Sequence, residues 1–303
     1  MKKSLIALAV LGASGFAMAQ SSVTLYGVAD AGIGRSHNYA TGVNTTGMKA
    51  NDTVNNGNSR LGVRGVEDLG GGLKAGFNFE AGLNLKTGAN DAAFWQRNAN
   101  MYLAGSWGQF LMGRTLDPSF FGAATWELTG MANYSVVANT FGFGGDGTPR
   151  NNSQFTYTSP NFGGFSGSLG YIFKDDNGGN AKWDLNLKYA NGPLGVALTA
   201  NKTQTMKTGW SLGGQYKFGT FVVAASYNDL QTVRRGFSIG GTANFGPGSV
   251  TLDLTRDTKN PVKKYTNALI EGKYSLSKRT FVYADYLRLD GENNYGIGVR
   301  HNF

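Results

Sequence analysis

Residues 294–303 read NYGIGVRHNF, and this stretch decides the fold class. Tyr295, Ile297 and Val299 alternate with small or polar residues, so a β-strand here would carry its large apolar side chains on one face. Such a strand needs a hydrogen-bonded partner along each edge. The stretch therefore predicts a sheet whose other strands are supplied by the preceding residues.

The composition favours β structure with many turns. The 303 residues include 46 glycines, 13% aromatic residues, only 16% charged residues and no cysteine. The lack of cysteine excludes a disulfide framework and a thiolate metal site. No apolar run reaches the roughly 20 residues that a membrane-spanning helix needs.

The N-terminus has the pattern of a signal peptide. Lys2 and Lys3 precede a short apolar run over residues 5–11, and Ala17-Met18-Ala19 has the form of a cleavage site. We therefore expect residues 1–19 to be removed and residues 20–303 to form the mature protein. Loss of the two lysines lowers the formal charge from +9 to +7, since 26 basic residues then face 19 acidic ones.

Several segments alternate between apolar and polar residues with a period of two. In one of them Leu73, Phe77 and Leu83 share one face, while Lys74 and Glu80 share the other. Seven tight turns separate eight hairpins, which gives about 16 strands. Longer polar connections are expected near residues 36–58, 87–93, 115–149, 175–181, 202–208, 229–235, 256–263 and 289–294.

Short turns at one end, long loops at the other and an even number of strands are typical of transmembrane β-barrels. The second face of most strands carries Lys, Asp, Glu or Asn, and an interior this polar needs water. The sequence thus predicts an all-β protein with a 16-stranded antiparallel transmembrane β-barrel, lipid outside and a water-filled lumen. Residues 94–115 alternate poorly, as would a part of the wall that meets another subunit.

The connection over residues 116–149 is far longer than an ordinary hairpin loop. It is also rich in apolar side chains, whose burial is worth roughly 1.5–3 kcal/mol each. We expect this third loop to fold into the lumen and narrow it. The alternatives are that it packs on a neighbouring subunit or covers the mouth of the barrel. Its large apolar residues are Phe120, Phe121, Trp126, Leu128, Met131, Tyr134, Val136, Val137, Phe141 and Phe143.

Charged residues gather around this loop in the sequence. Arg60 and Arg64 lie on the polar face of one strand, and Arg114 and Arg150 flank the base of the loop. Arginines on the wall opposite loop carboxylates would set up a field that low-dielectric walls strengthen. The alternative is that the arginines only neutralise wall carboxylates and brace the barrel. The carboxylates concerned are Asp117, Glu127 and Asp146 on the loop, and Glu67, Asp68 and Glu80 on the wall.

Five sequence features together resemble a known family. They are SSVTLYGVAD over residues 21–30, SRLGVRGVEDLGGGLKA over 59–75, the pair Gly113-Arg114, RNNSQFTYTSPNFGGF over 150–165, and Phe303. The chain resembles the trimeric general porins of Gram-negative outer membranes, in particular the neisserial and β-proteobacterial branch. The resemblance implies a homotrimer, a third loop in the pore and passive diffusion of small hydrophilic solutes. It also implies that the barrel-assembly machinery recognises the strand ending in Phe303.

The same resemblance suggests which residues line the pore. In anion-selective relatives a basic cluster lies at the constriction, and its positions match Arg60, Arg97 and Arg150 here. Glu80 matches a wall carboxylate of the same branch. The resemblance would therefore turn Arg97 towards the lumen, although it shares a face with Trp95 in the alternation.

Other functional classes find little support in the residues. The glycines 142, 144 and 147 fit GxGxxG but lack the strand and helix of a dinucleotide site. Neither His37 nor His301 belongs to a hydrolase constellation, so no enzyme, cofactor or metal is predicted. The basic residues are spread over an exported chain, which favours small anions and lipopolysaccharide phosphates as partners over nucleic acid. We expect an anion-selective outer-membrane porin; the alternatives are a substrate-specific porin, a non-conducting barrel adhesin and an outer-membrane hydrolase.

Overall fold

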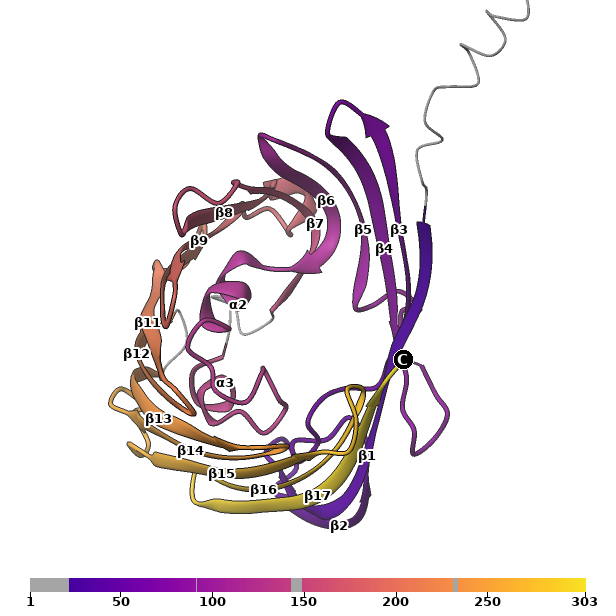
Figure 1. Cartoon of the computed structure of the whole chain (residues 1–303). Coiled ribbons are helices and arrows are strands. Elements are labelled where there is room, and N and C mark those ends of the chain that lie inside the picture. Colours follow the sequence, from indigo (N-terminus) through magenta and orange to yellow (C-terminus); the bar gives the residue numbers. More distant parts are fainter. Residues whose placement is uncertain (1–21, 91, 143–148, 231–233) are drawn as a thin grey trace, which may run out of the picture.

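The computed structural model describes residues 22–90, 92–142, 149–230 and 234–303, and Figure 1 shows its strands arranged in a ring. The predicted signal peptide, residues 1–19, and residues 143–148 of the long loop lie outside the described residues. The strands are β1 (Ser22–Asn38), β2 (Val43–Lys49), β3 (Arg60–Gly70), β4 (Leu73–Gly82), β5 (Asn98–Gly105), β6 (Gly108–Leu116), β7 (Arg150–Thr158), β8 (Phe165–Ile172), β9 (Lys182–Asn191), β10 (Leu194–Thr203), β11 (Gly209–Phe218), β12 (Phe221–Asp229), β13 (Arg235–Phe245), β14 (Gly248–Asp257), β15 (Thr266–Ser275), β16 (Thr280–Leu289) and β17 (Glu292–Asn302).

The sheet closes on itself because the first and last strands pair. β1 and β17 run antiparallel in register from Val28↔Asn302 to Arg35↔Tyr295. Beyond the ladder, Gly27 N donates to Phe303 O at 2.9 Å, and Phe303 N donates to Gly27 O at 3.1 Å. The closing role expected of the last strand is thus confirmed.

The barrel has 16 strand positions although 17 strands are distinguished. β2 and β3 both pair with β1, at its C-terminal and N-terminal halves respectively. They occupy one position in the wall and are separated by residues 50–59. Apart from the closing pair β1–β17, all other neighbours around the ring are consecutive antiparallel strands. The predicted all-β, 16-stranded antiparallel barrel is confirmed.

The two faces of the wall differ as the alternation predicts. On β12, Phe221 and Val223 are exposed on the outside, whereas Ser226 and Asn228 are buried towards the lumen. Cross-strand hydroxyl pairs bond inside the barrel, as between Ser226 and Ser238 at 2.7 Å. The outer face is therefore apolar and the inner face polar.

Two predicted loops are wrong. Residues 36–58 form the end of β1, a turn and β2 before the chain bends into the barrel, so strand pairing replaces most of the expected loop. Residues 289–294 contain only a two-residue hairpin turn, between Leu289 at the end of β16 and Glu292 at the start of β17. Its residues Asp290 and Gly291 have φ of 52° and 92°, the left-handed backbone that such a turn requires.

Two short helices follow β6, and Figure 1 shows both within the ring of strands. α2 (Pro118–Ala123) begins with a proline and is capped by Asp117, whose carboxylate accepts a hydrogen bond from Phe120 N at 2.9 Å. α3 (Val136–Phe141) is capped by Ser135. A single 3₁₀ turn spans Lys174–Asp176. Among the described residues, no helix is long and apolar enough to cross a membrane.

Apolar side chains of the segment between β6 and β7 pack against the inner wall. α2 lies against β9 and β10, whereas α3 lies against β13 to β16. Trp126 packs with Ala197 and Ala224. A larger cluster joins the segment to β15 and β16; it includes Tyr134, Val136, Val137, Phe141, Leu269, Leu287 and Leu289. Burial of these side chains holds the segment on the wall.

Candidate functional site

A cavity of about 520 Å³ lies between the wall and the segment that carries the helices. Four arginines from different parts of the wall reach it, together with one carboxylate and several amides. The wall contributes Arg60 on β3, Glu80 on β4, Arg97 before β5, Arg150 on β7 and Arg300 on β17, and the segment contributes Met131, Asn133 and Asn139. The cavity therefore has a basic side and a neutral side.

Glu80 is the charged centre of the basic side. Its carboxylate lies 2.7 Å from Arg97 Nε and 3.4 Å from Arg60 Nε. Tyr26 Oη donates to the same carboxylate at 3.0 Å. Arg150 Nε donates to the backbone oxygen of Arg97 at 2.9 Å, so the third arginine stands beside the first two. Two guanidinium groups thus share one carboxylate, and a third stands beside them.

Arg97 lies outside the regular strand alternation. β5 begins only at Asn98, and Arg97 N donates to Glu80 O at 3.1 Å just before it. This contact and the ion pair to Glu80 direct the side chain into the barrel. The inward orientation agrees with the expectation drawn from the resemblance and not with the one drawn from the alternation.

Sequence reasoning did not single out Arg300 as a site residue. Its NH1 donates to Asn56 Oδ1 at 2.8 Å, and its Nε donates to Asn302 Oδ1 at 3.2 Å. The alternation in the sequence could have identified it. Arg300 lies on the face of β17 opposite Val299, together with two glycines, and this is the inner face. With Arg300, the described residues that line the cavity include four arginines and one carboxylate, a formal charge of +3.

Residues 50–59, between β2 and β3, reach inward and support the site. Val54 is buried beside Gly296, where an added Cβ would lie 3.0 Å from the Cβ of Val54. Asn55 Nδ2 donates to Asp30 Oδ1 at 3.2 Å. Asn56 Nδ2 donates to Tyr134 Oη at 2.7 Å, which links this inward segment to the one that carries the helices.

The neutral side of the cavity is built from amides. Asn133 Nδ2 donates to Asn58 Oδ1 at 2.7 Å and to Asp52 O at 3.1 Å. Asn139 Nδ2 donates to the backbone oxygens of Asn133 and Ser135 at 2.7 and 2.8 Å. The amides are thereby held in place across from the arginines.

The predicted loop carboxylates lie elsewhere. Asp117 caps α2, as described above. Glu127 accepts hydrogen bonds from Thr129 N at 3.0 Å, Thr129 Oγ1 at 2.6 Å and Met131 N at 2.6 Å, which closes a turn within the segment. Neither carboxylate is among the residues lining the cavity.

Two of the five predicted arginines also lie apart from the cavity. The guanidinium of Arg64 stands over the ring of Tyr26, 5.1 Å from its centre. Arg114 donates to Gln96 O and to Asn152 Oδ1. The structure thus brings together Arg60, Arg97 and Arg150 with Glu80, and leaves Arg64 and Arg114 outside.

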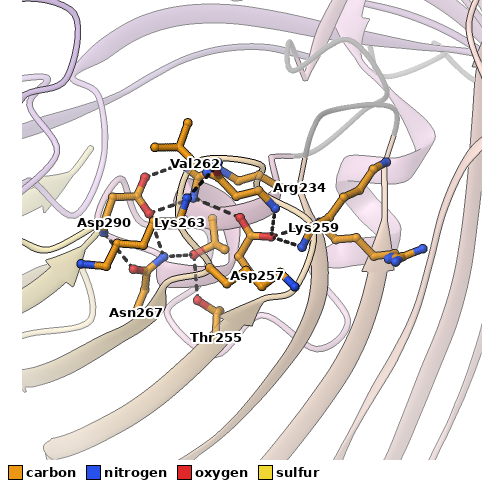
Figure 2. Close-up of polar contacts among 12 residues, drawn as sticks. Arg234, Thr255, Asp257, Lys259, Val262, Lys263, Asn267 and Asp290 are labelled. Carbon is orange, nitrogen blue, oxygen red and sulfur yellow. Dashed lines mark hydrogen bonds and ion pairs between the residues drawn. The ribbon is translucent and has the colours of Figure 1, made fainter.

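A polar network ties α3 to the connections at the barrel mouth, and Figure 2 shows part of it. Thr140 Oγ1 on α3 lies 2.8 Å from Thr255 Oγ1, and Asn267 Nδ2 donates to Thr140 Oγ1 at 2.9 Å. Arg234 NH1 donates to Asp290 Oδ1 at 2.8 Å, and this hydrogen bond raises the pKa of Arg234 above its ordinary value. The helix is therefore anchored at its C-terminal end by hydrogen bonds as well as by apolar packing.

Comparison with known proteins places the chain in a family. Residues 4–294 match the model of a family described as Gram-negative porin. The chain is 39% identical over 217 residues to outer membrane porin protein 32 of Delftia acidovorans, covering 68% of this chain and 61% of that protein. It is 32% identical over 206 residues to the major outer membrane protein P.IB of Neisseria lactamica, covering 63% and 56% of the two chains.

A solved structure extends the likeness to the fold. The anion-selective porin from Comamonas acidovorans superposes with a TM-score of 0.77 and 27% identity, covering 94% of this chain and 100% of that one. The chain belongs to the Gram-negative porin family, and it is an outer-membrane β-barrel of the neisserial and β-proteobacterial branch. The match spans about three fifths of the length of the first two curated relatives.

Proposed function

We propose that this protein forms a water-filled channel for the passive diffusion of small hydrophilic solutes across the outer membrane, with a preference for anions. The observation that carries the proposal is the cluster of Arg60, Arg97, Arg150 and Arg300 around the single carboxylate of Glu80. The proposal includes no catalytic step and no cofactor.

The proposed selectivity is electrostatic. A formal charge of +3 beside the diffusion path attracts an anion and repels a cation at every position within about a Debye length, roughly 8–10 Å. The barrel wall and its lipid have a low dielectric constant, so field lines concentrate in the water column. Amides opposite the arginines can hydrogen-bond a passing solute without adding charge.

The proposed steric limit comes from the segment between β6 and β7. Its helices pack on neighbouring parts of the inner wall, α2 on β9 and β10 and α3 on β13 to β16, and its amides face the arginines. We therefore assign residues 116–149 the role of a constriction loop. In this scheme Asp117 and Glu127 shape the loop, and Arg64 and Arg114 contribute only at longer range. The homotrimer, the recognition of Phe303 by the barrel-assembly machinery, and contact with lipopolysaccharide belong to the same proposal and rest on the family.

The test is the reversal potential of single channels in a planar bilayer under a tenfold KCl gradient. We expect stepwise conductance with a potential favouring chloride. Arg60→Glu, Arg97→Glu and Arg150→Glu should each move the potential towards potassium. Arg279→Glu, in the turn between β15 and β16, is the matched control and should move it little. Conductance that favours potassium in the unmodified protein would refute the assignment of the arginines. A sealed membrane from correctly folded protein would refute the channel.

A further inference from the structure

A second cavity, of about 390 Å³, lies inside the barrel at the end that carries the tight turns. We call it the turn-side cavity, and we call the cavity of Arg60, Arg97, Arg150 and Arg300 the arginine cavity. Among the described residues, none lines both cavities. The turn-side cavity lies between the wall at β9 to β11 and the residues of α2 and just after it. Its volume is within the range of about 300–1,000 Å³ that pockets for small organic molecules have.

Two lysines on the inner face of the wall reach the turn-side cavity. Lys188 on β9 follows Leu187, whose side chain is exposed on the outside of the barrel. Lys217 on β11 follows Tyr216, which is exposed in the same way. Between the two strands, β10 contributes Gly195 to the lining. Because glycine has no side chain, the floor between the lysines is open to both ammonium groups.

The two lysines leave positive charge in the cavity. In the part of the chain that the structure describes, neither Lys188 nor Lys217 forms an ion pair. No described residue that lines the cavity carries a carboxylate. Asp184 lies on the same face of β9 but is buried, and its carboxylate accepts hydrogen bonds from Ser119 N at 2.6 Å and Ser119 Oγ at 2.8 Å. The cavity therefore has a formal charge of +2 that an anionic solute can neutralise.

An exposed aromatic ring stands beside the lysines. Phe121 on α2 lines the turn-side cavity and is 52% exposed, although Figure 1 shows α2 within the ring of strands. Its ring lies edge-on to that of Phe120, with 5.7 Å between the ring centres and 88° between the planes. Phe120 lines the arginine cavity, so the two rings connect the two cavities. An apolar ring in contact with water gains free energy when a ligand covers it.

We propose that the turn-side cavity binds a solute with a carboxylate on an aromatic ring, of which benzoate is the simplest. The carboxylate lies between the ammonium groups of Lys188 and Lys217, and the amide of Gln215 is a further hydrogen-bond donor beside them. The ring lies against Phe121 and next to Pro193. The charged and the apolar group of one small molecule are thus matched by two parts of the cavity.

The position of the cavity gives it a place on the diffusion path. Tight turns face the periplasm in barrels of this type, so the turn-side cavity is on the periplasmic side of the arginine cavity. A solute bound there is in front of the arginines when it leaves the periplasm and behind them when it enters. This role in transport rests on the proposed function, whereas binding of benzoate is measured without transport.

The test uses the absence of cysteine from the chain. The variant A124C places a single thiol in the turn-side cavity, and M131C places one in the arginine cavity. Methyl methanethiosulfonate, which is uncharged, modifies each thiol in the purified, folded protein at low salt, and the solute concentration that halves the rate is measured. For A124C we expect this concentration to be about fivefold lower for benzoate than for acetate, which lacks the ring. It should be about fifteenfold lower for benzoate than for benzamide, which lacks the charge.

Removal of either part of the cavity should weaken the protection of A124C selectively. K188Q/K217Q should raise the benzoate concentration required about fifteenfold, since an ammonium group about 5 Å from a carboxylate in water contributes about fourfold. The same change should leave protection by benzamide as it was. Phe121→Leu should raise the benzoate concentration about fivefold, the contribution of one contact between rings, and should not affect acetate.

The matched control is K278Q/R279Q in the same A124C background. It removes two basic residues from the turn between β15 and β16, another tight turn, and should leave the protection by benzoate unchanged. Heat-modifiable migration on gels verifies that each variant is folded.

Three results would overturn the proposal. One is protection of M131C by benzoate without protection of A124C, which would place the anion in the arginine cavity alone. Another is equal protection of A124C by benzoate with and without K188Q/K217Q. The third is equal protection by benzoate and acetate, which would make the cavity a site for any small anion. Absent conductance in the unmodified protein would refute the channel and leave the binding result as measured.

Discussion

Replacement of Glu80 by Gln changes the charge of the cavity while keeping the size of the side chain. Glu80 is nearly isosteric with Gln, and among the described residues that line the cavity its carboxylate is the only one. The substitution raises the formal charge there from +3 to +4. Since the carboxylate holds Arg97 at 2.7 Å and Arg60 at 3.4 Å, it also loosens two arginines.

The expected size of the effect follows from Coulomb's law. An ion passing about 7 Å from the removed charge in water changes its energy by about 0.6 kcal/mol. Chloride is stabilised and potassium destabilised by that amount, so their difference changes by about 1.2 kcal/mol. This corresponds to an increase of about sevenfold in the ratio of chloride to potassium permeability.

Reversal potentials under a tenfold KCl gradient measure this ratio directly. Glu67→Gln, on the outward face of β3, is the matched control and should leave the ratio unchanged. Glu80→Asp keeps the charge and separates electrostatics from the altered arginine geometry. A potential that does not move in Glu80→Gln, or moves towards potassium, would refute the account of the cavity given above.

Three further substitutions test the parts around the cavity. Arg300→Gln lowers the cavity charge by one and should reduce the chloride preference by about sevenfold; an unchanged reversal potential would exclude Arg300 from the selective cluster. Tyr134→Phe removes the acceptor of the hydrogen bond from Asn56 and should cost about 1 kcal/mol, seen as a lower unfolding midpoint on heat-modifiability gels, and an equal midpoint would contradict this. Gly296→Leu would collide with Val54 and displace the inward segment, so single-channel conductance should change; wild-type conductance would show that the segment does not bound the pore.

The strand pattern was predictable because each strand obeys a simple rule. Leu73, Phe77 and Glu80 lie on the faces that the alternation assigns, and β17 closes the sheet as its apolar face requires. The alternation of inner and outer residues fails where the pairing of two strands is interrupted. The register of β6 with β7 shifts between Gly113 and Thr115, so the face on which Arg114 lies cannot be predicted from alternation.

The turn at residues 290–291 and the role of Asp117 have local sequence signals that we interpreted wrongly. Asp290-Gly291 is a strong signal for a two-residue hairpin, although the surrounding polar residues suggested a longer loop. Asp117 precedes a proline, the pattern of a helix cap, and so serves the helix and not the arginines.

The inward course of residues 50–59 could not be predicted from the local sequence. Its polar residues are typical of a surface loop, and only distant partners turn it into the barrel. Asn55 bonds to Tyr283 across 228 positions of the chain, and Asn56 bonds to Tyr134 across 78. The sequence pattern of these ten residues cannot predict contacts with residues so far away in the chain.

The dependence of this inward segment on both ends of the chain bears on the order of folding. Asp30 on β1 accepts a hydrogen bond from Tyr283 on β16 at 2.6 Å, across 253 positions. Contacts of such long range form late, because the intervening chain has to be ordered first. The part of its support that comes from β16 and β17 therefore forms only when the first and last strands meet. A barrel that stalls before closure lacks Arg300 beside Arg60, so the arginine cluster of the proposed channel is completed in the same step that seals the wall.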